Sequence, residues 1–180
     1  MEVIALVGMA GSGKSEVSRV FEDAGFKRVR FGDVTDEEIK RRGLELNETN
    51  ERQVREHLRQ DYGKAVYAIL SIPKIDKYLV SSDVIIDGLY SWEEYNVLRE
   101  KYADNLILVL VHSSPKTRYA RLAQRPIRPL TKQEGQSRDA AEIENINKGG
   151  PIAMADHVII NESSMEQMTQ DTERIITKLK

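Results

Sequence analysis

Eight residues near the N-terminus have the types and the spacing of a phosphate-binding loop. The stretch Gly8-Met9-Ala10-Gly11-Ser12-Gly13-Lys14-Ser15 fits the pattern G-x-x-x-x-G-K-[ST], in which backbone N–H groups surround phosphate oxygens. Lys14 would neutralise the β- and γ-phosphates of ATP, and the Ser15 hydroxyl would bind Mg²⁺. The alternative is a glycine-rich turn without a ligand, which the flanking strand and helix patterns disfavour. The predicted nucleotide-binding residues are Gly8, Gly11, Ser12, Gly13, Lys14 and Ser15.

A second candidate for the same site is Asp87, the acid that ends the apolar run Val84-Ile85-Ile86. The carboxyl ends of parallel strands gather at one edge of a sheet, so Asp87 should lie beside the phosphate loop. There it would hold Mg²⁺, directly or through water. The alternative is a turn aspartate before Gly88.

Arginines recur beyond the middle of the chain with few acids between them. Phosphoryl transfer needs such cations, because negative charge on the transferred group must be balanced. We therefore predict that at least one of them clamps this group, with surface solubility as the alternative. Arg118 belongs to the same series, and the candidates for the clamp are Arg121, Arg125, Arg128 and Arg138.

The acceptor for that group is expected between residues 35 and 70, after the second strand. Arg52, Arg55 and Arg59 form a stripe on a helix there, either as ligand-binding groups or as a solvated face paired with Glu51 and Glu56.

The residue predicted to orient or deprotonate an acceptor hydroxyl is Asp33, at the end of the second strand. Its alternative role is that of a strand-end turn residue.

These residues need a scaffold of alternating strands and helices. Apolar runs predict strands, helical periodicity follows most of them, and the first strand–loop–helix–strand unit implies a right-handed parallel crossover. The predicted strands span residues 3–7, 27–31, 84–87, 106–111 and 155–160. We expect one α/β domain over residues 1–180.

Two helices are predicted in the acceptor region. A capping box at Thr35-Asp36-Glu37-Glu38 should open a short helix that closes at Gly43. A long amphipathic helix should follow and end at Pro73; its buried face is predicted to carry Val54, Leu58, Tyr62, Ala65 and Ile69.

Residues 126–150 are polar and bounded by proline and glycine. Their composition, with a capping box at Thr131 to Glu134 and basic Arg138 and Lys148, predicts a lid that closes over the nucleotide and excludes water. The alternative is a helical hairpin with no gating role.

Composition limits the kind of partner. The chain has 180 residues, a formal net charge of −2 and no cysteine. Interspersed charges argue against nucleic acid as a partner, and from the N-terminal residues and the lack of a membrane-length apolar run we expect neither a signal peptide nor a membrane span. We expect a soluble, cytoplasmic protein with small anionic ligands; the sequence does not predict its oligomeric state.

Several segments resemble the P-loop kinases of the adenylate kinase and dephospho-CoA kinase group. These are the phosphate loop, Ile86-Asp87-Gly88, Arg118-x-x-Arg121-Leu122-x-x-Arg125 and Ala155-Asp156-His157-Val158-Ile159-Ile160-Asn161-Glu162-Ser163. Over nearly its whole length the chain resembles more closely an archaeal, nucleotide-kinase-like family described as dephospho-CoA-kinase-related. The matching segments are Gly32-Asp33-Val34, Tyr62-Gly63, Ile72-Pro73-Lys74-Ile75, His112-x-Ser114-Pro115-Lys116-Thr117-Arg118 and Arg138-Asp139.

The resemblance implies a three-layer P-loop fold: a parallel five-stranded sheet with helices on both faces, a helical acceptor-binding insertion near 35–70 and a lid near 126–150. Two segments depart from it. Leu89-Tyr90-Ser91 stands where related kinases have an arginine, so a contact to an acceptor phosphate is either missing or supplied by Arg42, Arg55 or Arg59. Pro126-Ile127-Arg128-Pro129 makes the start of the lid stiffer than usual.

The function predicted is Mg²⁺-dependent transfer of the γ-phosphoryl group of ATP to a small acceptor, a nucleoside monophosphate or a dephospho-CoA-like molecule. The alternative is a regulatory or switch ATPase that hydrolyses ATP slowly without an acceptor. No sequence for reading guanine is complete, because Thr131-Lys132-Gln133-Glu134 and Asn147-Lys148-Gly149-Gly150 both lack part of it.

Overall fold

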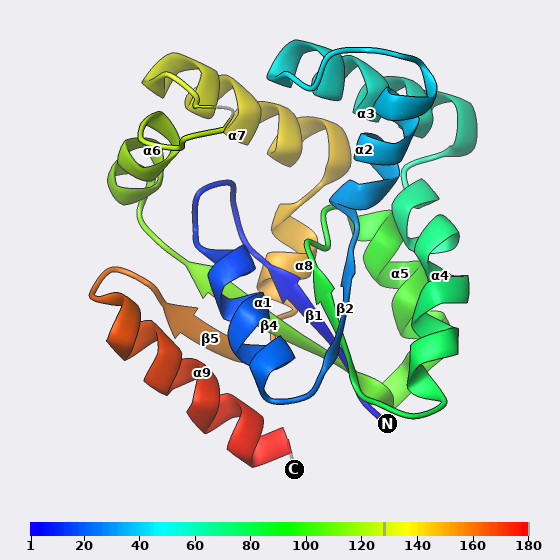
Figure 1. Ribbon diagram of the computed structural model, residues 1–180, viewed down its shortest axis with the longest axis vertical. Helices are drawn as coiled ribbons and strands as arrows, with labels where there is room; N and C mark the ends of the chain where they lie inside the picture. The colour runs from blue at the N-terminus through cyan, green and yellow to red at the C-terminus, as the bar shows by residue number, and fades with distance from the viewer. Residues whose placement is uncertain (128, 180) are drawn as a thin grey trace.

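A computed structural model describes residues 1–127 and 129–179 and contains the predicted five-stranded sheet. Its strand order is β2-β3-β1-β4-β5, and each pair of neighbours is parallel (Figure 1). The strands are β1 (Val3–Val7), β2 (Lys27–Arg30), β3 (Val84–Asp87), β4 (Leu106–His112) and β5 (His157–Ile160). The predicted fold class is therefore confirmed.

The central strand β1 places the phosphate loop. All of its residues are buried, as expected for a strand covered on both faces. It pairs with β3 on one side, with Leu6 opposite Asp87, and with β4 on the other, with Val7 opposite Leu110. The loop after β1 therefore emerges between two neighbouring strand ends, where open α/β sheets bind ligands.

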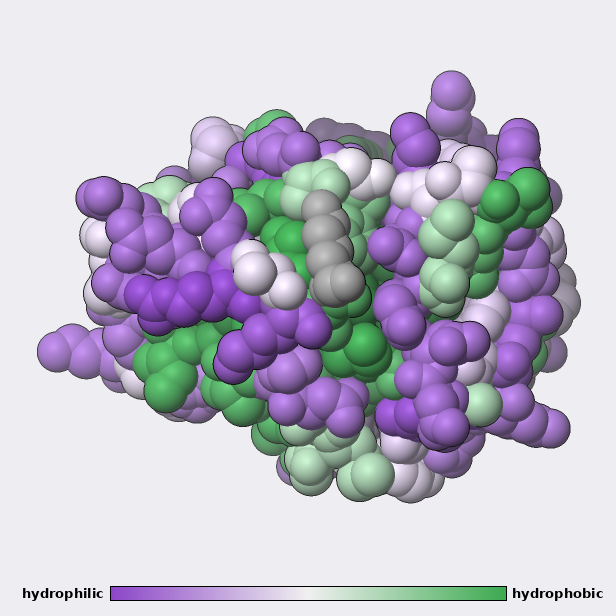
Figure 2. Space-filling model, turned by 90° about the horizontal axis from the view of Figure 1, so that it is seen from below, coloured by the Kyte–Doolittle hydropathy of each residue, from purple (hydrophilic) through white to green (hydrophobic). Residues whose placement is uncertain are grey.

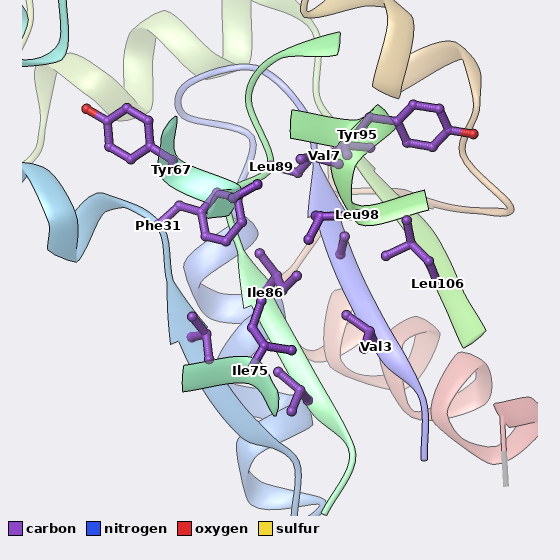
Figure 3. Close-up of a cluster of buried hydrophobic side chains, with 14 of the residues drawn as sticks. Val3, Val7, Phe31, Tyr67, Ile75, Ile86, Leu89, Tyr95, Leu98 and Leu106 are labelled. Atoms are coloured by element: carbon purple, nitrogen blue, oxygen red, sulfur yellow. The ribbon is translucent and has the colours of Figure 1, made fainter. Parts of the chain in front are cut away.

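Two layers of helices cover the sheet. On one face, α1 (Lys14–Asp23) packs beside α9 (Met165–Leu179) over a core that includes Phe21 and Met168. The other face is covered by α4 (Val66–Leu79) and α5 (Trp92–Tyr102), with α8 (Gly149–Ala153) against α5. Figure 3 shows this second core, in which Ile75 and Leu98 pack against β1 and β3. A short 3₁₀ helix, Ala103–Asn105, links α5 to β4.

The remaining helices lie at the edge of the sheet where the strands end. They are α2 (Gly32–Arg41), α3 (Glu48–Tyr62), α6 (Pro115–Ala123) and α7 (Lys132–Ile146). In Figure 1, α6 and α7 lie on one side of the phosphate loop and α2 and α3 on the other. The two groups form opposite walls around the loop.

The long helix predicted through Ile69 is wrong, because the chain breaks at Gly63. Gly63 has φ +86° and ψ 164°, a conformation that side chains with a Cβ avoid, and it ends α3. A new helix, α4, begins at Val66 and contains Pro73 instead of ending there. Consequently Tyr62 and Ile69, predicted to be buried, are 68% and 51% exposed.

The helix start predicted at Thr35 is also wrong. The helix α2 begins earlier, at Gly32, so Thr35 lies inside it. Its side chain is buried, and the hydroxyl is 2.7 Å from the Tyr67 hydroxyl of α4. A long-range hydrogen bond, invisible in local sequence, takes the place of the predicted cap.

Hydrophilic side chains cover most of the end of the molecule at which the chain termini lie, with smaller apolar areas between them (Figure 2). Among the helices of the described residues, none has the length and apolar character needed to cross a membrane.

The break at Gly63 can be tested with two identical substitutions. We expect Gly63→Ala to lower the free energy of unfolding by about 1–3 kcal/mol, because the backbone strain is added without any steric clash. Gly149→Ala is the matched control: Gly149 lies in α8 with open space around it and no positive φ, so alanine should leave stability unchanged or raise it by up to about 1 kcal/mol. Chemical denaturation measures both; equal effects would contradict this account of the break.

Candidate active site

The phosphate loop is held open by side chains from three other elements. Ser12 O accepts hydrogen bonds from Asn161 Nδ2 after β5 (2.9 Å) and from Ser113 Oγ after β4 (3.3 Å). Ala10 O accepts one from Arg118 of α6 (3.2 Å). These partners fix the loop carbonyls. In the part of the chain that the structure describes, the backbone N–H groups of Gly13, Lys14 and Ser15 make no hydrogen bond, which leaves them able to bind an anion.

Position 13 requires glycine for two reasons. One is its φ of +101°, and the other is the close packing of Asn161 against the loop. A Cβ atom at this position would lie 2.2 Å from Asn161 Nδ2, the amide that holds Ser12 O. A side chain would therefore displace the group that shapes the loop. Gly8 and Gly11 also have positive φ values.

Lys14 is turned back onto its own loop. Its Nζ donates to Gly8 O (2.7 Å) and Met9 O (3.1 Å). Desolvation in the cleft, together with the positive charge of Lys148, lowers the pKa of Lys14 to about 7 against the opposing effects of Glu142 and Asp87. Bound phosphate would reverse this shift by supplying negative charge.

Asp87 lies at the carboxyl end of β3, opposite Leu6 at the end of β1, and lines the same cleft as Lys14. It is buried, and one carboxylate oxygen accepts a hydrogen bond from Arg28 of β2. The spacing of the two residues in the sequence does not predict this pairing. Ser15 also lines the cleft and is exposed. One hydroxyl and one carboxylate are oxygen ligands of the kind that Mg²⁺ prefers, and Mg²⁺ is usually held by few protein groups together with substrate phosphates. Among the described residues no cluster of three or more acidic or histidine side chains could hold a metal by itself.

The cleft has a volume of ≈ 1260 Å³ and runs from the phosphate loop to α3. On the side of α6 and α7 it is lined by Arg121, Arg125 and Arg138, three of the predicted clamp residues. Arg121 donates to Ser113 Oγ (3.0 Å) and Asn161 Oδ1 (3.4 Å). Arg128, the fourth, lies outside the described residues.

Arg118, from the same series, has a structural role. Its guanidinium is buried and donates to both oxygens of Asp139 in α7, at 3.0 and 2.7 Å. Tyr119 donates to the same carboxylate (2.8 Å). Arg118 therefore joins the phosphate loop, α6 and α7, and its donors are used within the protein.

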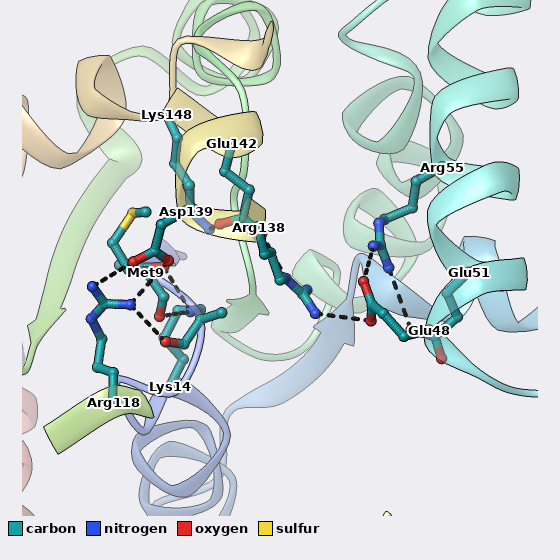
Figure 4. A network of polar contacts seen from close by, with 12 residues as sticks. Met9, Lys14, Glu48, Glu51, Arg55, Arg118, Arg138, Asp139, Glu142 and Lys148 are labelled. Atoms are coloured by element: carbon teal, nitrogen blue, oxygen red, sulfur yellow. Dashed lines mark hydrogen bonds and ion pairs between the residues drawn. The ribbon is translucent and has the colours of Figure 1, made fainter. Parts of the chain in front are cut away.

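The segment predicted as a lid crosses the cleft and contacts the opposite wall. Arg138 of α7 forms an ion pair with Glu48 at the start of α3 (3.2 Å), and Glu48 also pairs with Arg55 (2.7 Å; Figure 4). Segments 90 residues apart are thus joined above the phosphate loop. Burial alone would lower the pKa of Arg138, but Glu142 and Glu48 raise it.

Two residues behind this contact, Glu142 and Lys148, were not predicted as site residues. Lys148 is fully buried and donates to Glu142 Oε2 (2.5 Å), and its ammonium lies 4.9 Å from the centre of the Tyr90 ring. Burial would raise the pKa of Glu142, but Lys148 and Arg138 outweigh it and lower the pKa. The turn at Asn147, which has the left-handed conformation, brings Lys148 back toward Glu142. The spacing of these residues in the sequence does not indicate this contact.

Asp33 is not among the described residues that line the cleft. It lies in the first turn of α2, where it pairs with Arg30 (2.9 Å) and lies 3.8 Å from Lys74. Asp36, one turn later, also pairs with Arg30 (2.7 Å) and does line the cleft. On the side of the cleft formed by α3, the lining arginines include Arg55 and Arg59. Arg42, which pairs with Glu38 (2.6 Å), is absent from the described lining.

Two solved kinases share this fold. A gluconokinase from Sinorhizobium meliloti superposes with a TM-score of 0.56 at 14% identity, over 99% of this chain and 95% of that one. A shikimate kinase from Bacteroides thetaiotaomicron gives a TM-score of 0.64 at 13% identity, over 99% and 98%. At such identities the likeness establishes a P-loop kinase-like fold and nothing about the substrate.

Sequence comparison gives the family. Residues 4–147 match a protein-family model described as an AAA domain. A UPF0200 protein of Thermococcus kodakarensis is 35% identical over 181 residues, covering 98% of this chain and 97% of the relative. A UPF0200 protein of Hyperthermus butylicus is 33% identical over 181 residues, covering 98% and 94%. With its AAA domain and its full-length relatives, the chain belongs to the UPF0200 family.

Proposed function

We propose that this protein is a Mg²⁺-dependent phosphotransferase that moves the γ-phosphoryl group of ATP to a small acceptor. The observation that supports this most directly is the continuous cleft from the phosphate loop to α3, bordered by the basic side chains of α6 and α7. Binding ATP alone requires only the loop. A cleft that extends to a second set of charged helices provides room for a second substrate.

The donor side uses the loop. The N–H groups of Gly13, Lys14 and Ser15 and the Lys14 ammonium would bind the β- and γ-phosphates. Ser15 and Asp87 would hold Mg²⁺, which when bound neutralises phosphate charge. Arg28 would keep Asp87 oriented toward the cleft through its contact with one carboxylate oxygen.

The lid side would stabilise the transferred group. Arg121, Arg125 and Arg138 all line the cleft, and Lys148 and Glu142 support Arg138 from behind. Cations placed in advance around the reacting oxygens lower the barrier because they need little reorganisation. Arg128 belongs to the same proposal as the fourth basic side chain of the series.

The acceptor would bind against α2 and α3 as a nucleoside monophosphate or a dephospho-CoA-like molecule. For an acceptor that reacts through a hydroxyl, a carboxylate must orient or accept the proton. Asp36 lines the cleft and is better placed for this role than Asp33.

The proposal is tested by ADP release from ATP and Mg²⁺ in the presence of nucleoside monophosphates, dephospho-CoA and small sugar acids. At least one acceptor should accelerate ADP release and appear as a phosphorylated product by mass spectrometry. Lys14→Ala should abolish it, because the loop loses the charge that binds the phosphates. Slow ATP hydrolysis that no acceptor accelerates would instead favour the switch ATPase.

Nucleotide binding should take up a proton at pH 8. The pKa of Lys14 is about 7 in the free protein, so at pH 8 the amine is mostly neutral, and bound phosphate should raise the pKa and protonate it. At pH 6 Lys14 is already charged and should take up none. Titration calorimetry in buffers of different ionisation enthalpy measures the uptake. Lys14→Arg, charged at both pH values, is the control; the same uptake at pH 8 in this variant would exclude Lys14 as its source.

The two carboxylates of α2 provide a matched pair of variants. With an acceptor that reacts through a hydroxyl, Asp36→Asn should lower kcat by roughly 100-fold or more, as for loss of a general base. Asp33→Asn, which has the same Arg30 partner but no place in the cleft lining, should stay within a few-fold of wild type. With AMP, which reacts through phosphate, neither change should matter much. A larger loss in Asp33→Asn would return the role to Asp33.

A further inference from the structure

The three arginines on the cleft side of α3 differ in whether oxygen atoms of the protein accept hydrogen bonds from their guanidinium groups. Arg52 pairs with Glu56 (2.9 Å), and its side chain is 53% exposed. Arg55 donates to Glu48 (2.7 Å) and Glu51 (3.4 Å). These two fit the description of a solvated, ion-paired helix face.

Arg59 is different. Its side chain is only 14% exposed, and its nearest ion-pair partner, Glu94 Oε1, lies 3.9 Å from Nη2, beyond hydrogen-bond distance. Over residues 1–127 and 129–179 the guanidinium makes no hydrogen bond, and Nε is buried without a partner. Leaving charged donors desolvated and without a hydrogen bond costs free energy, so such a group needs an explanation.

Tyr67 holds the Arg59 guanidinium in place without accepting a hydrogen bond from it. The guanidinium lies 4.9 Å from the centre of the Tyr67 ring, a cation–π contact that involves the ring face. Tyr67 is in turn held by the Thr35 hydroxyl (2.7 Å) and by an edge contact with Tyr90. Figure 3 shows the Tyr67 hydroxyl pointing away from the sheet core. The guanidinium is thus positioned in advance at the wall of the cleft.

Glu94 does not accept a hydrogen bond from Arg59. Its Oε2 accepts from the backbone N–H groups of Tyr90 and Ser91, which cap α5. Its Oε1 is buried and has no hydrogen bond. Other basic residues of the cleft contrast with Arg59, since each donates to a protein oxygen: Lys14, Arg30, Arg121, Arg138 and Lys148.

We propose that Arg59 binds an oxyanion of the acceptor, a carboxylate or a phosphate, and thereby selects anionic small molecules over neutral alcohols and sugars. The planar fork of donors in a guanidinium matches both kinds of oxyanion. The acceptor would lie with this group against Tyr67 and α3 and with its reacting group toward Lys14. This inference rests on the proposed function, whereas the anion site itself can be tested without turnover.

The binding test follows the Arg59 Nε–Hε signal by NMR in arginine-labelled protein, with the loop filled by Mg²⁺ and a non-hydrolysable ATP analogue. Loss of the signal in Arg59→Lys assigns it. Inorganic phosphate and acetate serve as separate probes and show which oxyanion is preferred. At least one should shift the signal saturably while the Arg52 signal stays unchanged. If neither anion gives a saturable shift, or if glycerol shifts the signal equally, the site does not exist.

The activity test compares acceptors that share reactive hydroxyls and differ in an anionic group, as in the pair of gluconate and glucitol. Only the anionic member of a pair should be phosphorylated efficiently. Arg59→Ala should raise its KM roughly 10- to 100-fold, the range for losing hydrogen bonds to a charged group. Arg59→Lys should recover part of this, and Arg52→Ala, on the same helix, should match wild type.

The outcomes separate the two proposals. Efficient phosphorylation of the neutral members would overturn the role of Arg59 and leave the kinase proposal standing. A saturable NMR shift without any phosphorylated acceptor would retain the anion site and overturn the kinase. An equal loss of kcat in Arg59→Ala and Arg59→Lys, with KM unchanged, would mean that Arg59 only supports the packing of Tyr67.

Discussion

The burial of several cations is the constraint that shapes this cleft. Burial lowers the pKa of Lys14 and of Lys148; the charge of Lys148 lowers the pKa of Lys14 further, and the charge of Arg138 lowers both. Within the protein Glu142 offsets this charge, and Glu48 offsets it from the opposite wall. The balance is partial, as the lowered pKa of Lys14 shows. A polyphosphate would complete it, so the same crowding that is unfavourable in the free protein favours nucleotide binding.

The two walls of the cleft handle charge differently. On the side of α6 and α7, the guanidinium of Arg118 is used in an ion pair with Asp139 that joins these two helices. On the side of α3, Arg59 lies against an aromatic ring, and its guanidinium makes no hydrogen bond with the described residues. The number of arginines does not distinguish the two walls. The hydrogen bonds of the guanidinium groups do distinguish Arg118, which helps to build the cleft, from Arg59, which can bind a ligand in it.

The sequence predicted what depends on local pattern. The apolar runs located the strands, the loop pattern located Lys14 between β1 and the body of α1, and the resemblance to an archaeal nucleotide-kinase-like family agrees with the UPF0200 relatives. It failed where distant contacts decide: Thr35 bonds to Tyr67, and Gly63 divides a helix whose periodicity continues. Asp33 stays a prediction as the residue that orients the acceptor hydroxyl; the spacing of residues in α2 did not indicate that Asp36 lines the cleft. The dephospho-CoA-like acceptor stays a prediction, because similarity of fold does not identify a substrate.

The contact between Asn161 and Ser12 has a consequence for when the phosphate site forms during folding. The two residues are 149 positions apart, and the amide of Asn161 holds the carbonyl that shapes the loop. During synthesis from the N-terminus, the loop sequence therefore emerges long before the strand that completes it. Closing so long a connection makes the phosphate site a late product of folding. A partly made chain would carry the whole signature sequence and still lack the site.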